Sequence, residues 1–205
     1  GEIILNYETV MAQLNKGTSK PVYLITGDQP YLTQRIKRSF LNLIPESERT
    51  MNYATYDMES TPLAQALDDA MSAPFFGEKR LVFVERAYFL TTENHRGNKI
   101  DHDIDGLIKY LEHPEPTSVV VFFATNGKLD SRKKVVKIIK KAAEVISLEA
   151  VGERQVRTLV QHNLEQDHFA IEPDALNLLL QRTGTDLSLI MNELDRKSTL
   201  LNSSH

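Results

Sequence analysis

Residues 21–32 decide the fold, and they read Pro21-Val-Tyr-Leu-Ile-Thr-Gly-Asp-Gln-Pro-Tyr-Leu32. Residues 22–26 are apolar, aromatic or β-branched, which predicts a short buried strand. Residues 27–29 predict a turn, and residues 30–44 predict an amphipathic helix with proline in its first turn. A strand, a turn and a helix in this order are typical of the opening of a nucleotide-binding fold.

The turn lacks the chemistry that binds nucleotide phosphates. A phosphate-binding loop uses several glycines, a lysine and a Ser or Thr that holds Mg²⁺. This turn has one glycine, Gly27, and no lysine, and it places the carboxylate of Asp28 where a phosphate would lie. Since like charges repel, the sequence predicts a nucleotide-hydrolase scaffold that neither hydrolyses ATP nor holds a cofactor. We therefore expect the chain to act by binding.

The composition narrows the partner and the compartment. The 205 residues carry a net charge of −4, which argues against coating nucleic acid through overall charge and favours a protein partner. The absence of cysteine excludes disulfides, a thiol nucleophile and thiolate metal sites. No stretch approaches the roughly 20 apolar residues of a membrane span, and the amino terminus has no signal pattern. We expect a cytoplasmic protein with no membrane partner.

Apolar and β-branched runs alternate with helical patterns through the first three quarters of the chain. The predicted strands are residues 22–26, 51–56, 81–85, 119–124 and 145–148. This alternation predicts an α/β fold, a parallel sheet with helices on both faces. Three of these helices have predicted starts. The first starts at Thr61 followed by Pro62, the second at Asp103 or Asp105, and the third at Asp130 with Ser131.

The pattern becomes purely helical after residue 148, which predicts a domain boundary. The expected domains are an α/β domain at residues 1–148 and a small helical lid at residues 149–196. The predicted lid helices are residues 152–166, 172–183 and 186–196. Residues 197–205 lose the apolar period and end in Asn-Ser-Ser-His, which we interpret as a remnant of the expression vector. Residues 91–103 predict a mobile loop whose role stays open.

Two adjacent aromatic residues stand where a polar connection would be ordinary. Pro74, Phe75 and Phe76 follow the helix that contains Met71 and directly precede Gly77. If they are buried, the two rings contribute to the core; if they are exposed, they form an apolar patch typical of a protein interface. Periodicity alone favours burial.

A basic segment is the second candidate site. Lys133, Lys137, Lys140 and Lys141 share one face of a predicted helix and are positioned to meet DNA phosphates. The alternative reading, which the pattern favours, is a solvated face opposite the apolar residues of the same helix. Because the helix has no set of aromatic residues for base stacking, we expect no sequence-specific recognition.

No metal site and no catalytic residue are predicted. The six histidines form no paired spacing with a carboxylate on one helix face. Ser72 and Ser131 lack the context of a nucleophile elbow.

Three motifs resemble one family. They are residues 22–32, the stretch Met71-Ser-Ala-Pro-Phe-Phe-Gly-Glu-Lys-Arg-Leu-Val82, and the stretch from Asp174 that ends in Gly184-Thr-Asp-Leu-Ser-Leu-Ile-Met-Asn-Glu-Leu194. Together they resemble the delta subunit of bacterial DNA polymerase III. This subunit is the wrench of the clamp loader. The resemblance runs to about Asp195, and the family's third, collar-forming domain has no counterpart. The chain thus looks like an amino-terminal fragment with two domains.

The resemblance implies an AAA+-like module without ATPase activity that works in DNA replication. In the family, two adjacent hydrophobic residues bind the sliding clamp, and their position falls on Phe75 and Phe76, with Met71 and Pro74 beside them. The implied partners are the sliding clamp, other clamp-loader subunits in a hetero-oligomer, and DNA through the assembled complex. The implied mechanism is preferential binding of an open clamp. The alternatives are an active P-loop-type NTPase with an atypical loop and a nucleic-acid binder acting through the basic helix.

Overall fold

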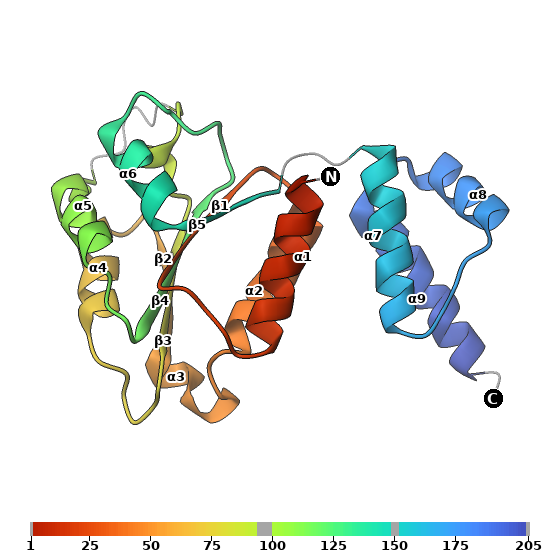
Figure 1. Cartoon of the computed structure of the whole chain (residues 1–205), viewed down its shortest axis with the longest axis horizontal. Coiled ribbons are helices and arrows are strands. Elements are labelled where there is room, and N and C mark those ends of the chain that lie inside the picture. Colours follow the sequence, from red (N-terminus) through yellow and green to blue (C-terminus); the bar gives the residue numbers. More distant parts are fainter. Residues whose placement is uncertain (1, 94–99, 149–151, 204–205) are drawn as a thin grey trace. The chain divides into compact units, whose positions relative to one another are not determined.

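The structure, a computed structural model, describes residues 2–93, 100–148 and 152–203 (Figure 1). These residues form two compact units, one of residues 5–148 and one of residues 152–203, with which residues 2–4 are grouped. The predicted domain end at residue 148 and the vector origin of residues 197–205 stay predictions. No helix in the described ranges combines the length and the apolar character needed to cross a membrane.

The first unit contains a parallel sheet in the order β2-β3-β4-β1-β5. The strands of the described residues are β1 (Val22–Thr26), β2 (Tyr53–Asp57), β3 (Arg80–Glu85), β4 (Ser118–Ala124) and β5 (Glu144–Ser147). Its helices are α1 (Glu2–Asn15), α2 (Pro30–Leu41), α3 (Arg49–Asn52), α4 (Leu63–Met71), α5 (Ile104–Glu112) and α6 (Lys134–Ala142), with 3₁₀ turns η1 (Glu46–Glu48) and η2 (Tyr88–Leu90). The predicted α/β fold is confirmed.

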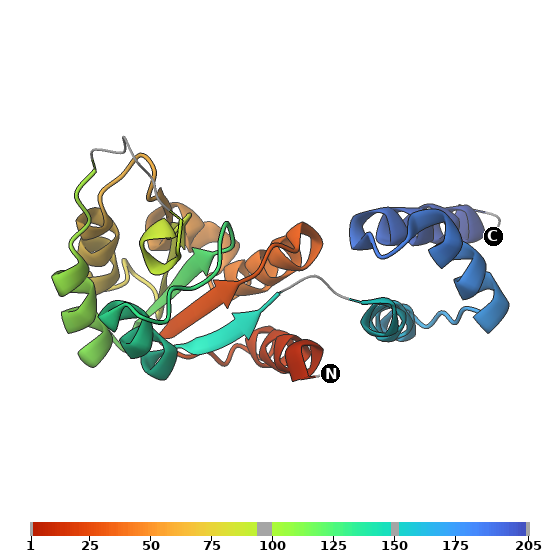
Figure 2. The same cartoon turned by 90° about the horizontal axis from the view of Figure 1, so that it is seen from above.

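Helices cover both faces of the sheet, because each strand alternates buried side chains between two cores. Figures 1 and 2 show α1 and α2 on one face and α4, α5 and α6 on the other. On the first face, Tyr23, Phe40, Phe83 and Phe123 form a chain of edge-to-face ring contacts. On the second face, Leu24, Val82, Val120 and Phe122 pack against the apolar sides of α4, α5 and α6. The sheet is thus a rigid support for the loops at its edges.

Two of the predicted helix caps are wrong. Helix α4 begins at Leu63 without a side-chain cap from its own segment, and the backbone N–H of Leu63 instead donates to Nδ1 of His102 at 3.0 Å. Helix α6 begins at Lys134, because Asp130 accepts from Arg132 N at 3.1 Å and so closes a turn before the helix. The cap of α5 is confirmed at Asp103, which accepts from the backbone N–H of Gly106.

The ends of the predicted loop at residues 91–103 are anchored. Thr91 pairs with Leu129 in an isolated bridge, and Thr92 N donates to Lys128 O at 2.9 Å. At the other end, His102 packs beside the start of α4. Residues 94–99, on which the rest of the mobile-loop prediction falls, lie outside the described residues.

The second unit consists of α7 (Glu153–Gln166), α8 (Pro173–Thr183) and α9 (Leu187–Ser203). Its core is made of aliphatic residues from all three helices, namely Val156, Leu159, Val160, Leu176, Leu179, Leu180, Leu187, Ile190 and Met191. Gly184, with φ +61°, ends α8 in a conformation that favours glycine. Helix α9 runs to Ser203, beyond the predicted end at Arg196, because Lys197 and the leucines after it are adequate helix formers.

Candidate protein-interaction site

The aromatic pair and the turn at Gly27 lie at opposite ends of the strands of the sheet. Phe75 and Phe76 come before β3, so they lie at the amino edge of this parallel sheet. The turn at Gly27 follows β1 and lies at the carboxyl edge, where nucleotide-binding folds hold phosphate. Gly27 has φ +88° and Asp28 is exposed, so the predicted turn is present with a carboxylate on its surface. The aromatic pair therefore belongs to a different surface from a nucleotide site.

The aromatic pair is exposed, so the burial that periodicity favoured is wrong. Phe75 is 50% exposed and Phe76 is 92% exposed, and the two rings pack edge to face with centroids 4.6 Å apart. Met71, at the end of α4, is 55% exposed, and Pro74 is half-buried. The connection from α4 to β3 thus presents an apolar surface to solvent, with nothing from the described residues covering it. Such a surface is typical of a protein-binding site.

Asn52, a residue that the sequence analysis did not identify, holds the aromatic pair in place. It is the last residue of α3 and is fully buried. Its Oδ1 accepts from Phe75 N at 2.6 Å, and its Nδ2 donates to Phe75 O at 2.9 Å and to Glu48 Oε1 at 3.3 Å. Both polar groups of the Phe75 backbone are therefore satisfied by one side chain.

The residues after Phe75 adopt a restricted conformation. Phe76 has φ +52°, in the left-handed region that costs a non-glycine residue about 1 kcal/mol or more. At Gly77, a Cβ would lie 2.0 Å from Glu48 Oε1 and 2.8 Å from Asn52 Nδ2. Only glycine fits beside the Glu48 and Asn52 side chains as they stand. The shape of this loop is thus set by contacts with η1 and α3.

Arg80, the first residue of β3, forms a second connection across the same region. Its guanidinium donates to Asp69 Oδ1 at 2.8 Å, Met51 O at 3.2 Å and Ala73 O at 3.4 Å. Asp69 also accepts from the Tyr56 hydroxyl, and burial together with this carboxylate raises the pKa of Tyr56 to about 12. The half-buried cluster therefore fixes the end of α4 relative to α3.

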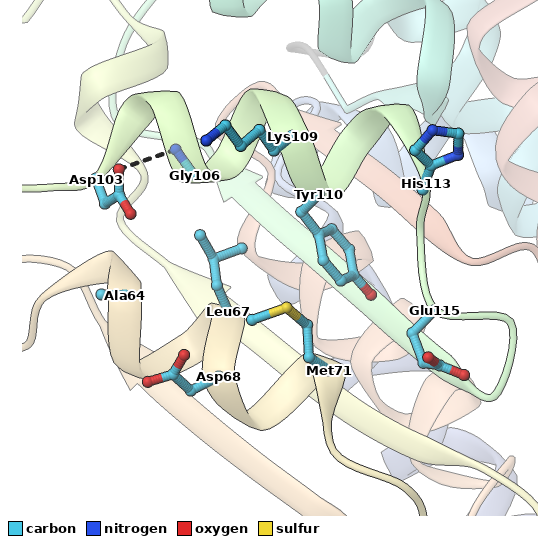
Figure 3. Close-up of a pocket in the computed structure, with 10 residues that line it drawn as sticks. All are labelled: Ala64, Leu67, Asp68, Met71, Asp103, Gly106, Lys109, Tyr110, His113 and Glu115. Carbon is cyan, nitrogen blue, oxygen red and sulfur yellow. Dashed lines mark hydrogen bonds between the residues drawn. The ribbon is translucent and has the colours of Figure 1, made fainter.

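A pocket of about 470 Å³ lies between α4 and α5, beside the exposed Met71. Figure 3 shows Leu67 and Met71 of α4 facing Tyr110 of α5 across it. Its rim carries the carboxylates of Asp68 and Glu115. The surface around Met71 is thus concave, whereas the Phe75 and Phe76 rings project.

The four lysines of the predicted basic face, which lie on α6 or directly before it, fall into two groups. Lys137, Lys140 and Lys141 are exposed, with Lys140 Nζ donating to Ser131 Oγ at 2.9 Å. Lys133 is half-buried, and its Nζ donates to the carbonyls of Phe89 and Thr91 at 2.9 and 3.2 Å. The structure therefore does not place Lys133 with the other three as a free cation.

Among the residues that the structure describes, no group of three or more His, Asp or Glu side chains is placed to hold a metal ion.

A family model for the delta subunit of DNA polymerase III matches residues 23–149. This chain belongs to the DNA polymerase III delta subunit family. The matched region includes all of the sheet except Val22, and the loop that carries Phe75 and Phe76.

Relatives of this delta-family chain agree with the assignment. It is 32% identical over 193 residues to DNA polymerase III subunit delta of Bacillus subtilis, and this match covers 94% of the chain and 55% of the relative. A solved structure of the Bacillus subtilis clamp loader delta protein YqeN matches with a TM-score of 0.85 and 31% identity over 95% of the chain and 57% of that protein. The chain therefore spans little more than half the length of these relatives.

More distant proteins match this chain in sequence or in fold. The Escherichia coli DNA polymerase III subunit tau is 30% identical over 113 residues, which is 55% of this chain and 15% of tau. The Thermotoga maritima RuvB branch migration motor matches with a TM-score of 0.51 at 11% identity, over 98% of the chain and 63% of RuvB. At this identity the likeness shows the fold alone, and it agrees with the predicted AAA+-like architecture.

Proposed function

We propose that this delta-family chain binds the sliding clamp of the replicative DNA polymerase through Met71, Pro74, Phe75 and Phe76. The observation that carries the proposal is the exposure of Phe75 and Phe76 on a loop whose backbone is held by a buried side chain. Burying an exposed phenylalanine ring in an apolar pocket contributes about 1.5–3 kcal/mol. Aromatic anchors of this kind dominate many protein interfaces.

The restricted loop favours tight binding because little entropy remains to be lost. A flexible loop loses conformational entropy when a partner orders it, which weakens the complex. Here the hydrogen bonds of Asn52 fix the backbone of Phe75, and the side chains of Glu48 and Asn52 lie close against Gly77 and restrict its position. The two rings are thus presented in a defined place before the clamp arrives.

Clamp opening in this proposal is an effect of differential affinity. A protein that binds the open clamp more tightly than the closed clamp shifts the equilibrium by the ratio of the two affinities. No bond is made or broken by the chain itself, and the Gly27 turn lacks the lysine and the glycines of a phosphate-binding loop. We assign ATP hydrolysis to other subunits of a hetero-oligomeric clamp loader that acts in the cytoplasm.

The exposed lysines of α6 support a second, weaker proposal. Lys137, Lys140 and Lys141 face solvent on one helix, and we propose that they approach DNA phosphates in the assembled complex. Lys133 contributes to this role only through the fold.

Surface plasmon resonance with the cognate sliding clamp tests the main proposal. We expect the Phe75→Ala/Phe76→Ala variant to bind at least about 100-fold more weakly than wild type, since two anchor residues are lost. Leu178→Ala removes an apolar side chain of α8 that is 61% exposed, between the values of Phe75 and Phe76, and serves as the control. Circular dichroism establishes that all three proteins are folded. Unchanged affinity in the folded double variant would refute clamp binding through this loop.

A further inference from the structure

Exposed apolar side chains of the first unit gather in one region. Among residues 6–93 and 100–148, the large hydrophobic side chains that are exposed are Met51, Met71, Phe75 and Phe76. Three of these belong to α4 and the loop after it. The fourth, Met51, lies on α3, 20 positions before Met71 in the sequence, and is as exposed as Met71.

The register of the sheet brings α3 next to the aromatic loop. Tyr53 of β2 pairs with Leu81 of β3 in parallel, so Met51 and Lys79, each two residues earlier, come to the same edge of the sheet. Figure 1 shows α3 and the connection from α4 to β3 at this same end. Met51 and the aromatic pair are therefore neighbours at the amino edge.

Two sets of hydrogen bonds join α3 to the loop. Asn52 binds the backbone of Phe75 at both of its polar groups, as described above. Arg80 reaches from the carbonyl of Met51 to the carbonyl of Ala73. Because the side chains of Asn52 and Arg80 both bind the backbone of the loop, and Arg80 also binds the backbone of α3, α3 and the loop are held as one unit.

We propose that α3 is part of the clamp-binding surface and that Met51 contacts an apolar part of the clamp beside Phe75 and Phe76. This inference rests on the proposed clamp binding and extends it to a segment outside the aromatic motif. The partner chemistry is an apolar protein surface, because a flexible, polarisable thioether packs against irregular apolar contacts. Thr50 and Glu78, both exposed, supply polar neighbours of the kind found at the rim of protein interfaces.

A nucleic acid fits this region less well than an apolar protein surface does. The groove beside Phe76, about 690 Å³ in volume, is lined by Glu48, Glu78 and Lys79, and Lys79 Nζ already donates to Gly17 O and Ser19 Oγ. A nucleic acid would be repelled by the two carboxylates near the aromatic pair. An apolar protein surface matches the four exposed side chains better.

Substitution of Met51 tests the inference without endangering the fold, because the side chain is exposed. In the clamp-binding experiment we expect Met51→Ala to weaken binding about 3- to 10-fold, and Met51→Glu to weaken it more than about 10-fold, because a carboxylate would be buried in the interface. Leu178→Ala and Leu178→Glu are the matched controls, and they should leave the affinity within about twofold of wild type.

A fluorescent label gives an independent readout. The chain has no cysteine, so Met51→Cys creates a single attachment point for an environment-sensitive dye. We expect its emission to change and saturate as the clamp is added, whereas the same dye at Leu178→Cys should not respond.

The results distinguish a role of α3 in clamp binding from clamp binding through the aromatic loop. If both Met51 substitutions and the dye at position 51 are without effect while Phe75→Ala/Phe76→Ala abolishes binding, then α3 is not part of the surface and clamp binding through the loop stands. If Phe75→Ala/Phe76→Ala also binds like wild type, or if the folded wild type does not bind at all, the proposed function fails together with this inference.

Discussion

The side-chain amide of Asn52 forms hydrogen bonds with both backbone polar groups of Phe75, at 2.6 Å to its N and 2.9 Å to its O. An amide that both accepts from and donates to one residue imitates the pairing of a neighbouring strand. The loop before β3 thereby has a fixed backbone although its side chains are exposed. Asn52 is therefore a positioning residue for the aromatic pair.

Asn52→Ala should lower both stability and clamp affinity. The variant leaves Phe75 N, Phe75 O and Glu48 without their partner, and each lost hydrogen bond costs about 1 kcal/mol or more when its group stays buried. We expect a loss of about 2–3 kcal/mol in the free energy of unfolding, measured by urea titration, and a weaker complex in the clamp-binding assay.

A double-mutant cycle separates positioning from simple destabilisation. If Asn52 acts through the rings, Asn52→Ala has no further effect on clamp affinity in the Phe75→Ala/Phe76→Ala background. Asn6→Ala is the matched control, because it removes an amide that donates to a backbone carbonyl, Val145 O, at 2.6 Å elsewhere in the same unit. An equal loss of affinity in both backgrounds would argue against positioning.

Gly77→Ala should destabilise the loop through a steric conflict with Glu48. The added Cβ would lie 2.0 Å from Glu48 Oε1, so the carboxylate must move and release Asn52. We expect a loss of about 1 kcal/mol in the free energy of unfolding, whereas Gly→Ala at an unstrained site stabilises by a similar amount.

The same substitution in a Glu48→Ala background tests this cause. Removal of the carboxylate opens the space beside residue 77, so the second substitution should cost less than it does in wild type. Equal losses in the two backgrounds would show that the conflict lies elsewhere, with Asn52 Nδ2 at 2.8 Å as the next candidate.

His102 should make the stability of the chain depend on pH. Its Nδ1 accepts from Leu63 N at 3.0 Å, and its Nε2 lies 2.9 Å from Met58 O and from the Tyr88 hydroxyl, an arrangement that suits the neutral ring. Burial lowers the pKa of His102 below its ordinary value of 6.5, against the opposing effects of Met58 O and Asp101. The stabilisation is fully present above about pH 6.5 and is lost as the pH falls toward the lowered pKa of the folded state.

Urea unfolding at pH 7.5 and pH 5.5 measures this effect. Wild type should lose more stability between the two pH values than His102→Gln, which keeps a polar side chain that does not titrate in this range. His113→Gln is the control, because His113 is an exposed histidine that directly follows α5 in the same unit. A pH response that is the same in wild type and His102→Gln would exclude His102 as its source.

Much of the fold was predictable from the sequence, because its signals are local. Each predicted strand overlaps its observed strand, since runs such as residues 119–124 have no polar side chain to place in a loop. The caps failed where a distant residue intervenes: Leu63 is capped by His102, 39 positions away, and no local pattern contains that pair. Helix α1 was not predicted at all.

The candidate site was predictable in part. Motif resemblance pointed to Phe75 and Phe76, whereas periodicity favoured burial of the same residues, because apolar residues before a strand ordinarily extend the core. The roles of Met51 and Asn52 were missed. Both were predicted in the strand at residues 51–56, whereas they end α3, and their relation to the loop arises only when β2 pairs with β3. Lys133 was grouped with Lys137, Lys140 and Lys141 by helical spacing, which carries no information about the carbonyls of Phe89 and Thr91.

Lys133 and Lys137 should therefore respond differently to substitution. Lys133→Ala removes two hydrogen bonds from a half-buried ammonium group to backbone carbonyls, and we expect a loss of about 1–2 kcal/mol in the free energy of unfolding. Lys137→Ala removes an exposed cation and should change stability by less than about 0.5 kcal/mol. Urea titration of both variants makes the comparison, and equal losses would contradict the division of these lysines into a bonded residue and exposed residues.

DNA binding by the assembled clamp loader should depend on the exposed lysines and not on Lys133. If Lys137 and Lys141 each neutralise a phosphate, the Lys137→Ala/Lys141→Ala variant binds DNA more weakly, and the slope of log affinity against log salt becomes shallower by about two. Lys133→Ala should leave that slope unchanged, because its ammonium group already donates to Phe89 O and Thr91 O. Fluorescence anisotropy of a labelled primer-template between low and moderate salt measures both slopes. Equal slopes for wild type and the double variant would show that the lysines of α6 only form a solvated outer face. The opposite, apolar side of the helix, which includes Val135, Val136 and Ile139, is buried.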